Sequence, residues 1–183
     1  MNFVVSPGEV RAAFGLTGVI YFPRHSAAHH QLDGRATLLL SSVGLPDTAW
    51  FMSRAGLHAD DPVLLSERYA EGTVPEGSRD WLVLGMFADT PLALAPDTGT
   101  VYALGAGETQ LSCTALHRDV ESLVHSLTKF QILQQELEAG GDEDREGRVD
   151  ALRAEITEFD PLPFASEDSQ WHLTFEEVID GIW

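Results

Sequence analysis

The chain has 183 residues, and its 29 acidic against 11 basic side chains give a formal net charge of −18. This length suits one domain with its own core, and a hydrophobic fraction of 44% excludes wholesale disorder. The negative field repels nucleic acid and anionic membranes and attracts basic partners, although acidity by itself also keeps a protein in solution. The single cysteine, Cys113, excludes an internal disulfide and a metal site built from cysteines.

A short helix and a strand are predicted at the start of the chain. Ser6 is a typical N-cap, Pro7 suits the first helical position, and Glu9 completes a capping box. Gly15 ends this helix, and residues 17–22 predict a strand. These residues contain no positive region and no long apolar run, and no later segment approaches the roughly 20 apolar residues of a membrane span. We therefore expect a cytoplasmic protein.

The next part of the chain predicts one helix followed by weakly patterned sequence. Residues 32–43 have a helical stripe of leucines, and the tripeptide Gly44-Leu45-Pro46 ends the helix. Between residues 47 and 79 the clearest signal is a short strand over residues 63–69.

Residues 80–102 give the strongest sheet signal, with three short strands joined by tight turns. In the last turn, Asp97-Thr98-Gly99, the glycine supplies the positive φ that the turn requires. A long helix is predicted from about Leu116 to Ala139, because its apolar residues recur at steps of three or four. A second helix follows an acidic break and ends before Pro161.

Three features of the chain resemble the SUKH superfamily, most closely its subfamily four. They are the strand pattern of residues 80–102, the helix that ends in Gly44-Leu45-Pro46, and the tail from Trp171 to Trp183. The resemblance is clearest over residues 32–183. It implies one α+β domain over residues 1–183, with a mixed or antiparallel central sheet flanked by helices. The family is known mainly as bacterial immunity proteins that bind and neutralise toxins, so the resemblance implies binding without a cofactor.

Our first hypothesis is a non-enzymatic protein that occludes the basic cleft of a toxin, such as a nuclease or a deaminase. Residues 132–183 hold 15 acidic and 3 basic side chains, so basic partners are steered towards this part of the chain. The expected contact residues are loop acids and the two aromatics that follow Gly44-Leu45-Pro46; they are Asp142, Glu143, Asp144, Glu146, Glu167, Asp168, Asp60, Asp61, Trp50 and Phe51. Trp81, Trp171 and Trp183 are instead expected to pack within the protein.

The alternative hypothesis is an enzyme or a small-ligand protein on the same scaffold. His25, His29, His30 and Asp33 could supply acid–base chemistry for a cofactor-independent dehydration or cyclisation in a biosynthetic pathway. The same residues would form a zinc or iron site if they lay on a helix, but Pro23 and the glycine after Asp33 disfavour a helix, and we expect no metal. A regulatory adaptor without toxin or chemistry would have the same sequence.

A second set of titratable residues, His117, Glu121 and His125, has spacing of four on the expected long helix. These residues lie at the edge of its apolar stripe, where we expect a solvated flank or a partner-facing edge. The sequence identifies no fourth ligand, so we expect no metal here either.

Overall fold

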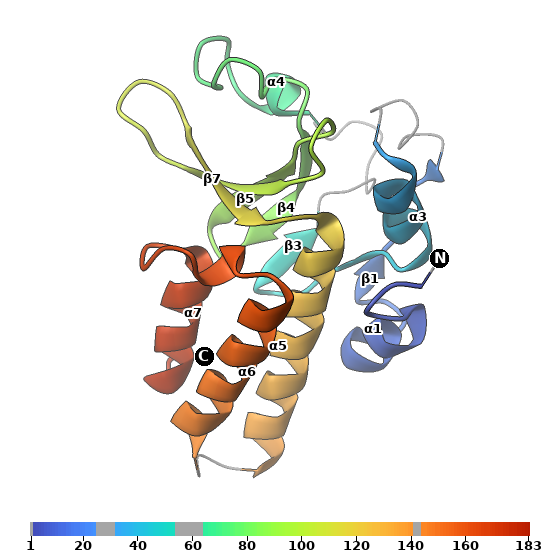
Figure 1. Cartoon of the computed structure of the whole chain (residues 1–183), viewed down its shortest axis with the longest axis vertical. Coiled ribbons are helices and arrows are strands. Elements are labelled where there is room, and N and C mark those ends of the chain that lie inside the picture. The colour runs from blue at the N-terminus through green and yellow to red at the C-terminus, as the bar shows by residue number, and fades with distance from the viewer. Residues whose placement is uncertain (1, 25–31, 54–63, 141–143) are drawn as a thin grey trace.

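The computed structural model describes residues 2–24, 32–53, 64–140 and 144–183 (Figure 1). In chain order its elements are α1 (Pro7–Phe14), β1 (Val19–Ile20), α3 (Gly34–Ser42), β2 (Leu45–Pro46), β3 (Phe51–Ser53), α4 (Leu65–Arg68), β4 (Leu82–Phe87), β5 (Thr90–Leu94), β6 (Val101–Gly105), β7 (Ser112–His117), α5 (Val120–Gly140), α6 (Arg145–Phe159), the 3-10 helix η1 (Leu162–Phe164) and α7 (Gln170–Ile179).

The fold is α+β, as expected, and every strand pairing in it is antiparallel. The main sheet has the order β3-β4-β5-β6-β7, and β1 and β2 form a separate two-stranded sheet. Helices α5, α6 and α7 stand together below the main sheet (Figure 1). One face of that sheet and these helices share the main hydrophobic core, which includes Leu84, Leu92, Leu127, Phe130 and Trp171. Within the described residues, no helix is both long and apolar enough to cross a bilayer.

The opposite face of the main sheet carries a second, smaller core. Leu65 of α4 packs there with Val83, Ala93 and Leu104. Trp81 is half-buried at the margin of this cluster and stacks on Tyr102. Strand side chains point alternately to opposite faces, so neighbouring residues of one strand serve the two different cores.

Local signals predicted α1 and the central hairpins correctly. The Ser6 side chain accepts a hydrogen bond from the Glu9 amide, the Glu9 carboxylate accepts one from the Ser6 amide, and Gly15 ends the helix. Strands β4, β5 and β6 occupy the predicted region, and Gly99 has the positive φ of 74° that its turn requires.

Two predictions in the middle of the chain are wrong. Leu65–Arg68 form helix α4 where a strand was expected, because the Glu67 carboxylate accepts the Leu64 amide and stabilises a helical turn. Of the expected strand there remains an isolated antiparallel bridge between Leu64 and Leu82. Residues 112–117 form strand β7, where the long helix was expected to begin at Leu116. That helix begins at Val120 instead, and the Asp119 carboxylate accepts the amide of Ser122 in its first turn.

Candidate partner-binding site

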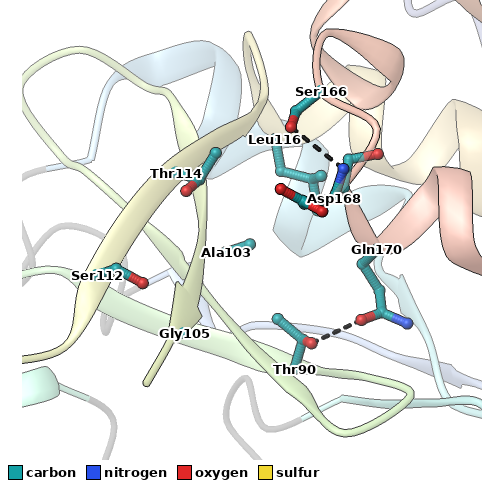
Figure 2. Close-up of a pocket in the computed structure, with 10 residues that line it drawn as sticks. Thr90, Ala103, Gly105, Ser112, Thr114, Leu116, Ser166, Asp168 and Gln170 are labelled. Atoms are coloured by element: carbon teal, nitrogen blue, oxygen red, sulfur yellow. Dashed lines mark hydrogen bonds between the residues drawn. The ribbon is translucent and has the colours of Figure 1, made fainter. Parts of the chain in front are cut away.

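A hollow of about 320 Å³ lies between the main sheet and the loop that precedes α7 (Figure 2). Its lining residues are Thr90, Ala103, Gly105, Ser112, Thr114, Leu116, Ser166, Asp168, Ser169 and Gln170. The register of β6 and β7 pairs Ala103 with Thr114 and Gly105 with Ser112. Paired residues of an antiparallel ladder lie on the same face, so β6 and β7 together form the floor.

The hollow exists because this end of the sheet face has small side chains beneath the loop and the first residue of α7. Where the helices cover the sheet, large residues such as Leu92 and Leu94 fill the space. At the floor of the hollow, Ala103 and Gly105 leave that space open. The first residue of α7 marks the boundary, since Thr90 Oγ1 donates a 2.7 Å hydrogen bond to Gln170 Oε1 (Figure 2).

The loop opposite the floor is held by hydrogen bonds of its serines. Ser169 Oγ accepts the His172 amide at 3.1 Å as the N-cap of α7, and it donates to the Pro163 carbonyl at 2.5 Å. The Asp168 amide donates to Ser166 Oγ at 3.2 Å. These contacts place the Asp168 side chain at the edge of the hollow, and both Asp168 and the neighbouring Glu167 are exposed.

The negative charge at this rim is not compensated. Within the described residues, the Asp168 carboxylate has no hydrogen-bond or ion-pair partner, and no basic residue lines the hollow. Several acids on the helices are paired; examples are Glu136 with Arg148, Glu155 with Lys129, and Glu176 with Arg153. Other helix acids, among them Glu138 and Glu158, have like Asp168 no partner within the described residues, but they do not line the hollow. The rim therefore offers a carboxylate that is free to bind a cation from outside the chain.

The predicted acidic contact residues do not form one patch. Asp144 and Glu146 lie at the start of α6, whereas Glu167 and Asp168 follow its end. A helix of 15 residues is about 22 Å long, so the two pairs lie at opposite ends of α6 (Figure 1). Asp60, Asp61, Asp142 and Glu143 fall outside the described residues.

The two aromatics among the expected contact residues, Trp50 and Phe51, pack mainly within the protein. Phe51 is fully buried, because its position in β3 points it into the main core. Trp50 is half-buried and makes edge contacts with Phe87, Phe130 and Trp183. These contacts include the expected packing of Trp183 within the protein. Neither aromatic lines the hollow.

The expectation of a solvated flank at His117, Glu121 and His125 is wrong, since all three are buried. His117 ends β7, and therefore the three do not share one helix. Glu121 accepts the Val4 amide at 2.6 Å and pairs with Arg35, which joins the N-terminal segment and α3 to α5. Among the described residues, no group of three or more His, Cys, Asp or Glu side chains could hold a metal ion.

His117 belongs to a buried chain of hydrogen bonds. Trp171 Nε1 donates to His117 Nε2 at 2.8 Å, which leaves the ring proton on Nδ1, 2.9 Å from Ser122 Oγ. Ser122 Oγ donates to Asp160 Oδ2 at 2.6 Å. Burial lowers the pKa of His117 to about 3, so the ring is neutral near pH 7.

This serine, histidine and aspartate do not have the arrangement of a hydrolase triad. The serine donates to the aspartate, whereas a nucleophilic serine gives its proton to the histidine. All of these side chains are inaccessible to a substrate. The network instead joins β7, α5, α6 and α7 at one point.

Asp33, the described member of the alternative acid–base cluster, caps α3. Its Oδ1 accepts the amides of Arg35 at 2.6 Å and Ala36 at 2.9 Å. Losing this cap in Asp33→Ala should lower the free energy of unfolding by about 1 kcal/mol, while Asp33→Asn should keep most of it. Urea denaturation would check this; equal loss in both variants would contradict a capping role. His25, His29 and His30 fall outside the described residues.

Sequence reasoning missed the floor of the hollow. Residues 112–115, Ser-Cys-Thr-Ala, alternate between polar and apolar side chains, which is the period-two pattern of a strand. That pattern could have identified β7. No motif marks Thr90 or Gln170, which both line the hollow although they are 80 residues apart in the sequence.

Comparison with known proteins agrees with the fold. The family model of the SUKH-4 immunity proteins matches residues 5–177, which is nearly the whole chain. No curated protein and no solved structure matches the chain. The matched span includes all the strands, both sides of the hollow, and the buried hydrogen-bond network. The chain therefore belongs to the SUKH-4 immunity protein family.

Proposed function

We propose that the protein neutralises a basic protein toxin by binding it through the acidic rim of the hollow, formed by Glu167 and Asp168. Membership of an immunity protein family carries the proposal. The unpaired rim carboxylate and the excess of acids over residues 132–183 support a basic partner. A nuclease or a deaminase that acts on nucleic acid has a basic cleft, whose positive charge complements the negative charge of the rim.

In this proposal the acidic rim and the overall negative charge of residues 132–183 have different roles. The field of the whole C-terminal part steers the partner during encounter, and such steering acts on the association rate. Contacts in the hollow set the lifetime of the complex, because a few desolvated anchors dominate dissociation. The start of α6, with Asp144 and Glu146, adds to the field from the far end of the helices.

Capture of the partner tests the proposal. The tagged protein would be isolated from its native host, and co-purifying proteins and small molecules would be identified by mass spectrometry. We expect a stoichiometric basic protein whose toxic activity is inhibited by the purified chain. A co-purifying metabolite without a protein partner would contradict the proposal and favour a ligand-binding pocket.

Neutralising the acids should slow partner association. We expect Glu167→Gln/Asp168→Asn to lower the association rate about tenfold at low salt and to flatten its salt dependence. Asp142→Asn/Glu143→Gln/Asp144→Asn should have a similar effect on the rate but a smaller one on dissociation. Surface plasmon resonance at several salt concentrations would measure both. Unchanged association in both variants would show that charge does not guide the encounter.

A further inference from the structure

We propose that the hollow beside α7 binds an arginine side chain of the partner, with the guanidinium against the Asp168 carboxylate. This inference rests on the proposed function and names the chemistry of the anchor that the partner inserts. Figure 2 shows the floor residues Ser112 and Thr114 on one side of the hollow and Asp168 and Gln170 on the other.

The polar side chains around the hollow can accept more hydrogen bonds than they can donate, because a carboxylate only accepts and each hydroxyl has two lone pairs and one proton. Asp168 supplies a carboxylate without a partner among the described residues, and Ser112 and Thr114 supply exposed hydroxyl oxygens. Gln170 Oε1 already accepts from Thr90, and an amide oxygen can accept a second hydrogen bond. An occupant rich in donors and positively charged complements this lining.

Arginine fits these acceptors better than lysine. A guanidinium has five N–H donors in a planar fork and can engage a carboxylate with two of them, whereas an ammonium has three donors around a point. The planar guanidinium fits into the space between the floor formed by β6 and β7 and the loop that precedes α7. Ala103 and Leu116 provide apolar contact for the aliphatic stem.

The position of α7 argues against an anion. A helix N-terminus attracts negative charge through its free amides and its dipole. Here Ser169 Oγ already accepts the His172 amide, and Asp168 places a negative charge directly before the cap. An anion would therefore meet repulsion from the carboxylate at the entrance.

The size of the hollow also suits a single side chain. Its volume of about 320 Å³ lies at the lower end of the roughly 300–1,000 Å³ that is typical of ligand sites. One arginine side chain with its guanidinium fits such a volume, whereas a folded element of the partner does not. The rest of the partner would lie on the rim.

The first test uses a blocked amino acid as the probe. Nα-acetyl-arginine methylamide would be titrated into the ¹⁵N-labelled protein, with the citrulline analogue as a neutral compound of the same shape. We expect shifts of the amide signals of Thr114 and Gln170 with the arginine compound and at least tenfold weaker binding of the citrulline compound. Equal binding of both compounds, or arginine shifts confined to other parts of the protein, would overturn the inference.

Three variants sharpen this test. Asp168→Asn should weaken arginine binding at least tenfold, and Thr114→Leu should abolish it by filling the hollow without a change in charge. Asp180→Asn is the matched control, because Asp180 is an exposed acid at the other end of α7 and lies outside the hollow. If Asp168→Asn bound the arginine compound as well as Asp180→Asn did, the site would be wrong.

Binding experiments with the captured partner distinguish a failure of this inference from a failure of the proposed function. If a toxin is captured and binds Asp168→Asn as tightly as Asp180→Asn, the arginine site is overturned and the proposed function stands. If the arginine titration succeeds but no protein is captured, the proposed function fails and the site stands. If replacing one arginine of the partner by alanine weakened binding as much as Asp168→Asn does, the arginine site and the proposed function would both be established.

Discussion

Substituting glutamine for His117 is expected to reduce the loss of stability that the protein shows as the pH falls from about 6.5 towards 3. Folding lowers the pKa of this ring, because burial outweighs the attraction of Asp160. Between the unfolded and folded pKa values the unfolded state binds more protons. The contribution of His117 is therefore fully present above pH 6.5 and falls by about 1.4 kcal/mol per pH unit below it.

The geometry gives an independent reason for the same sign. His117 Nε2 accepts the Trp171 indole N–H, so a proton on that nitrogen would break the hydrogen bond inside the core. Glutamine has both a donor and an acceptor and could keep the contacts to Trp171 and Ser122 without a titratable proton. By pH 5 the wild-type protein should lose about 2 kcal/mol through His117, and His117→Gln should lack this contribution.

Urea denaturation at pH values between 8 and 5 would measure this difference. The range stays above the region where most carboxylates titrate, so their protonation contributes little. His125 will leave a residual slope in the variant, since burial lowers its pKa as well. His172→Gln changes a half-buried histidine of α7 outside the His117 hydrogen-bond chain, so it is the control and should keep the slope that His117 causes. Parallel curves for the wild type and His117→Gln would contradict a buried neutral ring.

The elements that could be predicted from the sequence are those with local causes. The capping box at Ser6 and Glu9 and the turn at Gly99 are determined by side chains and backbone within a few residues. Strand β7 could not be found in this way. Leu116 and Val120 are four residues apart, which suits a helix, but pairing with β6 takes residues 112–117 into the sheet. The incorrect helix start then placed His117 on the wrong element.

The family could be predicted from the sequence, and Glu167 and Asp168 were among the contact residues expected from it, but the floor of the hollow was not predicted. The recurring residues of the family pattern build the scaffold: Val101 lies in the core and Gly99 closes a turn. Most residues around the hollow, such as Asp168 and Thr114, lie outside the motifs that carried the resemblance. Acids close in sequence were also expected to act together, yet α6 separates Glu146 from Glu167 along its length.

Gly44→Ala should destabilise the protein by about 3 kcal/mol, through backbone strain and steric overlap together. Gly44 has a φ of 84°, a conformation that alanine rarely adopts. An added Cβ would lie 2.7 Å from the carbonyl oxygen of Ile20 and 2.6 Å from Cγ1 of Val19. Because β1 and β2 pair at this point, relief of the overlap would require the two strands to separate. The glycine of the Gly-Leu-Pro tripeptide is therefore needed for this close approach.

The matched control is Gly34→Ala, at the first residue of α3. An added Cβ there meets nothing within 4 Å, and alanine is favoured over glycine in a helix by up to about 1 kcal/mol. We expect Gly34→Ala to unfold at the wild-type urea concentration or slightly above it, and Gly44→Ala well below it. Equal midpoints for the two variants would mean that β1 and β2 do not approach each other as closely as the structure shows. Because the hollow lies on the main sheet, soluble Gly44→Ala should still bind the arginine compound in conditions where it remains folded.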